Sequence, residues 1–105
     1  MEFPDYIQFG EVTKSFYCST NNLTSLRGCP RVVGGNFDCG DNILTSLKDA
    51  PKKVGRDFDC SYNQLSSLEG APKEVRGGFH CGGNSVQFTD NDVREVCYVR
   101  GVIYK

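Results

Sequence analysis

Residues 36–75, NFDCGDNILTSLKDAPKKVGRDFDCSYNQLSSLEGAPKEV, contain one pattern of side chains twice. Seven residues of the first copy are followed 21 residues later by the same residue type. They are Phe37, Cys39, Asn42, Leu44, Leu47, Pro51 and Val54, which return as Phe58, Cys60, Asn63, Leu65, Leu68, Pro72 and Val75. The pattern also starts upstream at Phe16 and continues downstream to Val86. A fixed period of this size predicts a solenoid, in which each unit buries its apolar side only against its neighbours.

Each repeat is expected to form one short strand and an irregular return. In the Phe-x-Cys segments the Phe and Cys side chains alternate with one outward residue, so both point to the same side of a strand. Gly34 and Gly35 precede one such segment, and Pro30 and Pro51 interrupt the path between segments, so a regular helix does not fit there. We expect a β-rich α+β solenoid with parallel strands about 4.8 Å apart. A turn at each Asn would lead into an irregular or 3₁₀-like return that carries Leu-x-x-Leu.

A row of asparagines falls where each strand must turn. Its members are Asn21, Asn42, Asn63 and Asn84. An inward amide can donate to and accept from the backbone of adjacent turns. A buried amide without such partners costs about 1–3 kcal/mol. The row therefore predicts a continuous ladder of hydrogen bonds between turns.

The segment Cys-x-x-Asn-x-Leu, from Cys39 to Leu44, and its copies resemble the leucine-rich repeat motif, with Phe and Cys at strand positions usually held by Leu. The LTSL…P return is similar to the short bacterial class of these repeats found in secreted effectors, whose period is about 20 residues. The chain carries no ligase domain with a catalytic cysteine, so the effector activity is not implied. The unit LSSLEGAPKEVRGGFHC more closely resembles small leucine-rich repeat proteins encoded by tailed bacteriophages. This resemblance covers roughly residues 12–90 and implies a leucine-rich repeat fold.

The length of 105 residues is that of a single domain. We expect an N-terminal cap at residues 1–15, repeats at 16–88 and a C-terminal cap of helix and strand at 89–105. Thr89 favours a helix start, and residues 98–105 are strand-prone. The apolar residues expected to cover the first repeat are Phe3, Tyr6, Ile7 and Phe9. We expect both terminal segments to cover the core rather than to dock partners.

The cysteine spacing indicates a core row instead of a disulfide framework. Cys18, Cys39, Cys60 and Cys81 follow the repeat period. In a reducing cytosol such thiols stay reduced and pack as small hydrophobes, and Cys29 and Cys97 are expected to do the same. Zinc requires tetrahedral ligands, which a straight row of thiols does not supply, and strand alternation points His80 away from Cys81. We therefore expect no metal and no cofactor.

The outward residues of the strands and of the turns that follow them would form a shallow face. Its predicted binding residues are Tyr17, Asp38, Asp41, Asp57, Asp59, Tyr62 and His80. The four aspartates make this face acidic, so it suits a basic protein surface. The two tyrosines and the histidine would serve as anchors. The alternative is a solvated sheet face whose aspartates discourage aggregation between sheets.

The return path has the opposite charge bias. Its basic residues are Arg27, Arg31, Lys48, Lys52, Lys53, Arg56, Lys73 and Arg76, against Asp49, Glu69 and Glu74. The net charge of −1 therefore conceals an acidic side and a basic side. Phosphate contacts are conceivable there, but no aromatic residue is interleaved with these cations to stack on bases. A solubilising surface is the preferred interpretation, and we expect no nucleic-acid partner.

Nothing in the sequence supports catalysis, which needs a nucleophile with a base, a carboxylate pair in a cleft or a phosphate loop. The first hypothesis is a non-enzymatic protein–protein interaction module. The phage resemblance implies a host bacterial protein as the partner, bound or inhibited in the host cytoplasm. The alternatives are nucleic-acid binding by the basic side, nucleic-acid mimicry by the aspartates, and self-association of an otherwise monomeric protein through an incompletely capped end.

With no basic flank or long apolar run, we expect a cytoplasmic protein without membrane contact.

Overall fold

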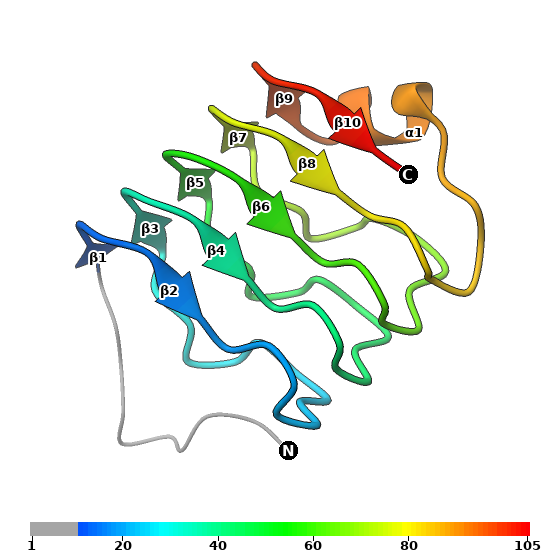
Figure 1. The fold of residues 1–105 in the computed structure, drawn as a ribbon, viewed down its shortest axis with the longest axis horizontal. Coiled ribbons are helices and arrows are strands. Elements are labelled where there is room, and N and C mark those ends of the chain that lie inside the picture. Colours follow the sequence, from blue (N-terminus) through cyan, green and yellow to red (C-terminus); the bar gives the residue numbers. More distant parts are fainter. Residues whose placement is uncertain (1–10) are drawn as a thin grey trace.

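A computed structural model describes residues 11–105 as a β-solenoid of about four turns (Figure 1). Two parallel sheets of five strands each run along the coil, and the chain visits both in every turn. Sheet A consists of β1 (Glu11–Val12), β3 (Val32–Val33), β5 (Lys53–Val54), β7 (Glu74–Val75) and β9 (Tyr98–Val99). Sheet B consists of β2 (Phe16–Tyr17), β4 (Phe37–Asp38), β6 (Phe58–Asp59), β8 (Phe79–His80) and β10 (Ile103–Tyr104).

Each repeat thus contains two strands, and the expectation of a wholly irregular return segment is incomplete. Val33, Val54 and Val75 lie in the strands of sheet A and point into the core. These strands are two residues long, which is too short to show a period-2 pattern in the sequence. Their pairing comes from backbone hydrogen bonds between turns, such as the bond from the Gly55 nitrogen to the Val33 oxygen (2.8 Å). Between residues 11 and 105 no return segment is a 3₁₀ helix.

The core consists of rows of identical side chains stacked along the coil. Phe37, Phe58 and Phe79 are fully buried. Their ring centroids are 5.7 Å and 5.1 Å apart from one turn to the next, within the range of favourable aromatic pairs. Burying one such side chain contributes about 1.5–3 kcal/mol. The predicted inward direction of Phe and Cys is confirmed.

The predicted asparagine ladder is confirmed for Asn42, Asn63 and Asn84, whereas Asn21, the first residue of the row, is exposed. The Asn42 amide nitrogen donates to the carbonyl oxygens of Cys18 (3.1 Å) and Cys39 (3.0 Å), and its oxygen accepts from the Leu23 nitrogen (2.9 Å). Asn63 repeats this arrangement one turn later. Every buried side-chain nitrogen and oxygen atom in the described part of the chain has a hydrogen-bond partner.

Each return contains a tight turn that begins at the second leucine of Leu-x-x-Leu and ends three residues later. The Ala50 nitrogen donates to the Leu47 oxygen (3.0 Å), and equivalent bonds close the neighbouring turns. The third residue of each turn has a positive φ: 90° at Gly28, 70° at Asp49 and 92° at Gly70. A turn of this kind favours glycine at that position, so Asp49 is the strained member of the row.

The C-terminal segment leaves the 21-residue period. Helix α1 (Asp90–Arg94) begins after Thr89, whose hydroxyl accepts from the Asp92 nitrogen (3.1 Å) while the Asp92 carboxylate accepts from the Thr89 nitrogen (2.9 Å). The chain then adds β9 beside β7 and β10 beside β8. The Lys105 ammonium lies 2.9 Å from the Asp90 carboxylate. The apolar N-terminal residues expected to cover the other end of the coil lie outside the described residues.

Candidate functional site

The outward residues of sheet B form one register-matched row. In the order of the strands the row is Tyr17, Asp38, Asp59, His80 and Tyr104. The Phe or Ile that precedes each of them on the strand points into the core, because side chains alternate. Tyr17 is 65 % exposed, whereas Asp38, Asp59 and His80 are half-buried. We call this row, together with the adjoining Asp41, Asp57, Ser61 and Tyr62, the sheet B face.

A second row of residues borders the face where each strand turns. Thr20, Asp41 and Tyr62 have positive φ values of 57°, 52° and 55°, and Gly83 continues the row with 67°. This left-handed conformation is uncommon for residues other than glycine. It directs the exposed Asp41 and Tyr62 away from the core. A Cβ on Gly83 would overlap the Tyr62 ring, so the glycine leaves room for that ring.

The two central carboxylates are oriented by the turns that follow them. The Asp38 Oδ1 accepts from the Gly40 nitrogen (2.9 Å), and the Asp59 Oδ1 accepts from the nitrogen (2.9 Å) and the hydroxyl of Ser61. Partial burial raises the pKa of Asp38, and the negative charges of Asp59 and Asp41 raise it further, against the bond from Gly40. The face therefore holds carboxylates close enough to repel each other.

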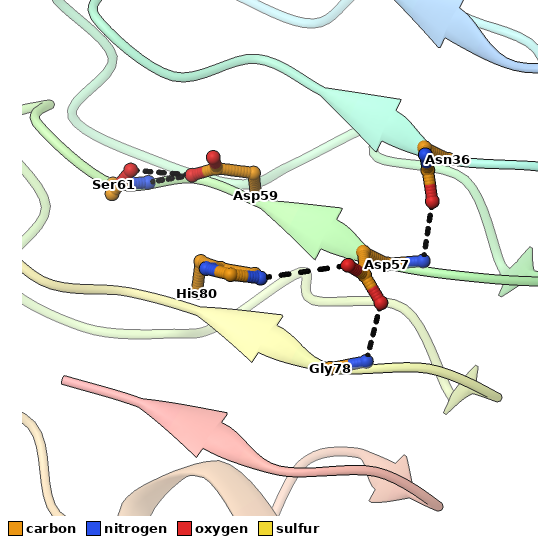
Figure 2. Close-up of polar contacts among 6 residues, drawn as sticks. All are labelled: Asn36, Asp57, Asp59, Ser61, Gly78 and His80. Atoms are coloured by element: carbon orange, nitrogen blue, oxygen red, sulfur yellow. Dashed lines mark hydrogen bonds and ion pairs between the residues drawn. The ribbon is translucent and has the colours of Figure 1, made fainter.

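A chain of side-chain acceptors fixes the corner beside the face (Figure 2). The Asn36 oxygen accepts from the Asp57 nitrogen (2.9 Å), and the Asp57 Oδ1 accepts from the Gly78 nitrogen (2.7 Å). The other Asp57 oxygen lies 3.7 Å from the His80 Nε2. His80 in turn stacks on Tyr104 with ring centroids 4.3 Å apart. Asp57 therefore joins two turns and positions His80.

All seven residues predicted from the sequence lie on the sheet B face or at its corner. Four of them share the central row or its continuation, and Asp41, Tyr62 and Asp57 border it. Sequence reasoning missed Tyr104, which extends the row, because it stands 24 residues after His80 instead of 21. It also missed the acceptor chain at the corner. The signal was present, because Ser15, Asn36 and Asp57 are polar residues at the repeat spacing.

The basic residues divide between two surfaces. Arg31, Lys52 and Lys73 are exposed on successive turns, and backbone bonds of 2.7 and 2.9 Å join those turns. We call these three residues the basic ladder. Lys53 lies instead on β5 of sheet A, and Arg76 directly follows β7, where its Nε lies 3.3 Å from the Glu74 carboxylate. The ladder borders a groove of about 710 Å³ that is lined in part by Arg31, Lys48 and Lys52.

All six thiols are buried and free, as predicted. Burial raises the pKa of Cys18 to about 12 and that of Cys81 to about 11, and it raises the pKa of Cys39 and Cys60 well above the usual range. The Cys39 thiol donates across to the Asp59 oxygen of the next turn (3.3 Å). Because the thiolate is the reactive form, these groups are poor nucleophiles.

Two kinds of feature are missing from residues 11–105. No three His, Cys, Asp or Glu side chains there are grouped so that they could hold a metal ion. The only helix in this part of the chain is α1, with five residues, and no helix is long and apolar enough to cross a membrane.

The fold and the face define a parallel β-solenoid with an acidic, tyrosine-bordered sheet surface. Comparisons of the chain with family models, with curated proteins and with solved structures give no match. The function must therefore be argued from the site itself.

Proposed function

We propose that this protein is a non-enzymatic binding module that docks a basic protein surface on the sheet B face. The observation that carries the proposal is the register-matched row of Tyr17, Asp38, Asp59 and His80. Parallel pairing holds the backbone of this row, on both sides for Asp38, Asp59 and His80 and on one side for Tyr17, so little conformational entropy is lost when a partner binds. Exposed tyrosines are frequent anchors of a protein interface, and the fixed carboxylates beside them can select a basic partner.

The electrostatics of the face support a cationic partner. Asp38 is partly desolvated and lies beside other acids, so its charge is poorly compensated in the free protein. An arginine or lysine placed above Asp38 and Asp59 relieves that repulsion and gains charge-assisted hydrogen bonds. Complementary charge of this kind raises association rates and selects partners.

We further propose that the coil is a leucine-rich repeat solenoid similar to the small proteins of tailed bacteriophages, with residues 89–105 closing its C-terminal end. Support comes from the recurring Cys-x-x-Asn-x-Leu motif and from the inward asparagines that bond the backbone of adjacent turns. On this proposal the partner is a host bacterial protein in the host cytoplasm, which the chain binds or inhibits.

A second candidate function is nucleic-acid binding by the basic ladder. The observation in its favour is that Arg31, Lys52 and Lys73 stack on successive turns, and no carboxylate of the described residues lies within 4.0 Å of them. Such a ladder would contact phosphates without reading bases, so binding would weaken steeply with salt.

Affinity capture from bacterial lysate, with and without nuclease, separates the two functions. We expect the wild-type protein to retain one protein partner in both samples and Asp38→Lys/Asp59→Lys to retain none. Lys52→Glu/Lys73→Glu serves as the matched control and should capture the partner normally. Loss of all retained material after nuclease treatment, or loss only in the lysine variant, would instead favour nucleic-acid binding.

A further inference from the structure

The outer side of sheet A carries its own register-matched row, which the proposed function does not use. From β1 to β9 the row is Glu11, Val32, Lys53, Glu74 and Tyr98. Tyr98 is 63 % exposed and Lys53 is exposed, whereas the next residue on each of these two strands is buried. The row therefore presents acidic, apolar, basic, acidic and aromatic groups in that order.

A shallow groove runs beside this row. The next outward position along each strand holds Gly34, Gly55, Arg76 and Arg100 on successive turns. Gly34 and Gly55 pack directly on the preceding turn, since a Cβ on Gly55 would overlap the Gly34 carbonyl. A groove of about 270 Å³ runs along β3, β5 and β7, and Gly34 and Gly55 are among its lining residues.

We propose that sheet A is a self-association face on which a second copy of this chain docks around a two-fold axis. The axis lies parallel to the strands, midway between β5 and β7. This rotation reverses the order of the strands and keeps positions along each strand unchanged. Lys53 then faces Glu74 of the second copy and Glu74 faces its Lys53, while Val32 faces Tyr98. The interface is isologous, so every contact occurs twice.

Charge selects this register over the neighbouring ones. Moving the axis onto β5 places Lys53 on Lys53, and moving it onto β7 places Glu74 on Glu74. An axis perpendicular to the strands would keep the strand order, so each strand would face its own copy and each charge an identical charge. Such like-charge contacts are strongly unfavourable. Midway between β5 and β7, Lys53 and Glu74 of both copies form a square in which each charge has opposite neighbours.

Shape favours the same register. The rotation that pairs Lys53 with Glu74 brings Arg76 over Gly55 and Arg100 over Gly34. Each long arginine side chain then meets a position that has no side chain, above the groove. Val32 and Tyr98 meet at the two outer ends and exclude water from the charged centre, as the apolar residues around an interface centre do.

The small size of the sheet limits the affinity. Its strands are two residues long, so the contact is well below the roughly 800 Å² per partner of a stable interface. We therefore expect a weak dimer that forms at high protein concentration and dissociates as salt screens the central charges.

The test is sedimentation velocity over a concentration series at low salt. Wild-type protein should associate, and Lys53→Glu and Glu74→Lys should each weaken association by at least about tenfold. An equimolar mixture of these two variants should form a heterodimer tighter than either homodimer. One copy then carries two central acids and the other two central lysines, so every central contact between the copies is attractive. The double variant Lys53→Glu/Glu74→Lys should recover wild-type association. Lys48→Glu, on the return turn, is the control and should behave as wild type.

Several outcomes would overturn the proposal. These are a wild-type protein that stays monomeric throughout the series, a dimer insensitive to Lys53→Glu, a mixture of the single variants that does not associate, and a dimer lost through Asp38→Lys instead. Thermal melting checks that each variant folds. If a charge-reversed variant does not fold, Lys53→Gln and Glu74→Gln replace the pair. Each should then weaken association severalfold, and mixing them should restore part of it, because the heterodimer regains one of the two Lys53–Glu74 contacts.

Discussion

The side-chain oxygen of Asn63 accepts a hydrogen bond from the Leu44 backbone nitrogen, one turn earlier, at 3.0 Å. The amide nitrogen of the same side chain donates to the Cys39 and Cys60 oxygens, both at 3.1 Å. One side chain thus satisfies backbone groups of two turns inside the core. The bend that follows β6 depends on this internal amide, because Asn63 is only 7 % exposed and its partners are backbone groups of the core.

Asn42→Leu should destabilise the protein by about 2–5 kcal/mol, although leucine is more hydrophobic. The change leaves the Leu23 nitrogen and the Cys18 oxygen buried without partners and removes one of the two amide donors to the Cys39 oxygen, the other being Asn63. Urea unfolding measures the loss. Asn21→Leu is the matched control, since Asn21 occupies the same repeat position but is exposed, and it should shift stability by less than about 0.5 kcal/mol. Equal effects of the two changes would contradict the role of the ladder.

Asp49→Gly should stabilise the protein by up to about 1 kcal/mol, because it removes a side chain from a left-handed position. Gly70→Ala, at the equivalent position one turn later, should destabilise it by about 1–3 kcal/mol, since a Cβ there would lie 2.7 Å from the Leu47 carbonyl carbon. Thermal melting of both variants checks the prediction. If Asp49→Gly is less stable than wild type, the contacts of the Asp49 side chain stabilise the fold by more than its left-handed backbone conformation destabilises it.

The buried thiols should make the protein less stable at alkaline pH. Burial raises their pKa above the usual value of about 9, to about 11 for Cys81 and Cys97 and about 12 for Cys18. Their contribution is fully present below the unfolded pKa and is lost as pH rises through the folded pKa, because the unfolded chain ionises first. Between pH 9 and 11 each protected thiol should lower stability by about 1.4 kcal/mol per pH unit.

Urea unfolding at several pH values, with wild type compared with Cys60→Ala, isolates one thiol. The variant should lose stability less steeply with pH, by the contribution of that single group, whereas tyrosine ionisation affects both proteins equally. Thiol labelling gives a second readout, since Cys39 and Cys60 should react far more slowly in the native protein than in denaturant. Parallel slopes for the two proteins, or native labelling as fast as in denaturant, would contradict the buried row.

Asp38→Asn should stabilise the free protein slightly, by less than about 1 kcal/mol at pH 7, while weakening partner capture. Partial burial and the neighbouring Asp59 and Asp41 raise the pKa of Asp38, so the ionised form at neutral pH opposes folding. The stability of the wild-type protein that depends on a protonated Asp38 is lost as pH rises through the raised pKa. Near pH 3 Asp38 is protonated in both the folded and the unfolded chain, so the stability gained from Asn should disappear there. Glu69→Gln, on the exposed return turn, is the matched control for the loss of one negative charge, and partner capture should be unchanged. An unchanged or lowered stability of Asp38→Asn at pH 7 would show that the carboxylate is well compensated.

The 21-residue period by itself determined the coil, its core rows and the asparagine ladder. A residue such as Phe58 can recur in register only if each turn stacks on the last, and a buried amide such as Asn42 requires backbone partners above and below it. Strand alternation then placed Asp38 and Asp59 on the outside. Much of the candidate face therefore followed from residue spacing alone.

Three features were decided only by the tertiary structure. The strands of sheet A are too short to leave a sequence pattern, so their pairing depends on backbone bonds between residues one turn apart. Tyr104 joins the face because α1 and the following segment lengthen the last turn, which places Ile103 beside Phe79 with a spacing of 24 residues. Asp57 reaches both Gly78 and His80. The physical reason is the same in each case: these contacts join atoms that are close only after the turns have stacked. Residue spacing can mark Asp57 as a repeated polar position, but it does not show which atoms the side chain meets.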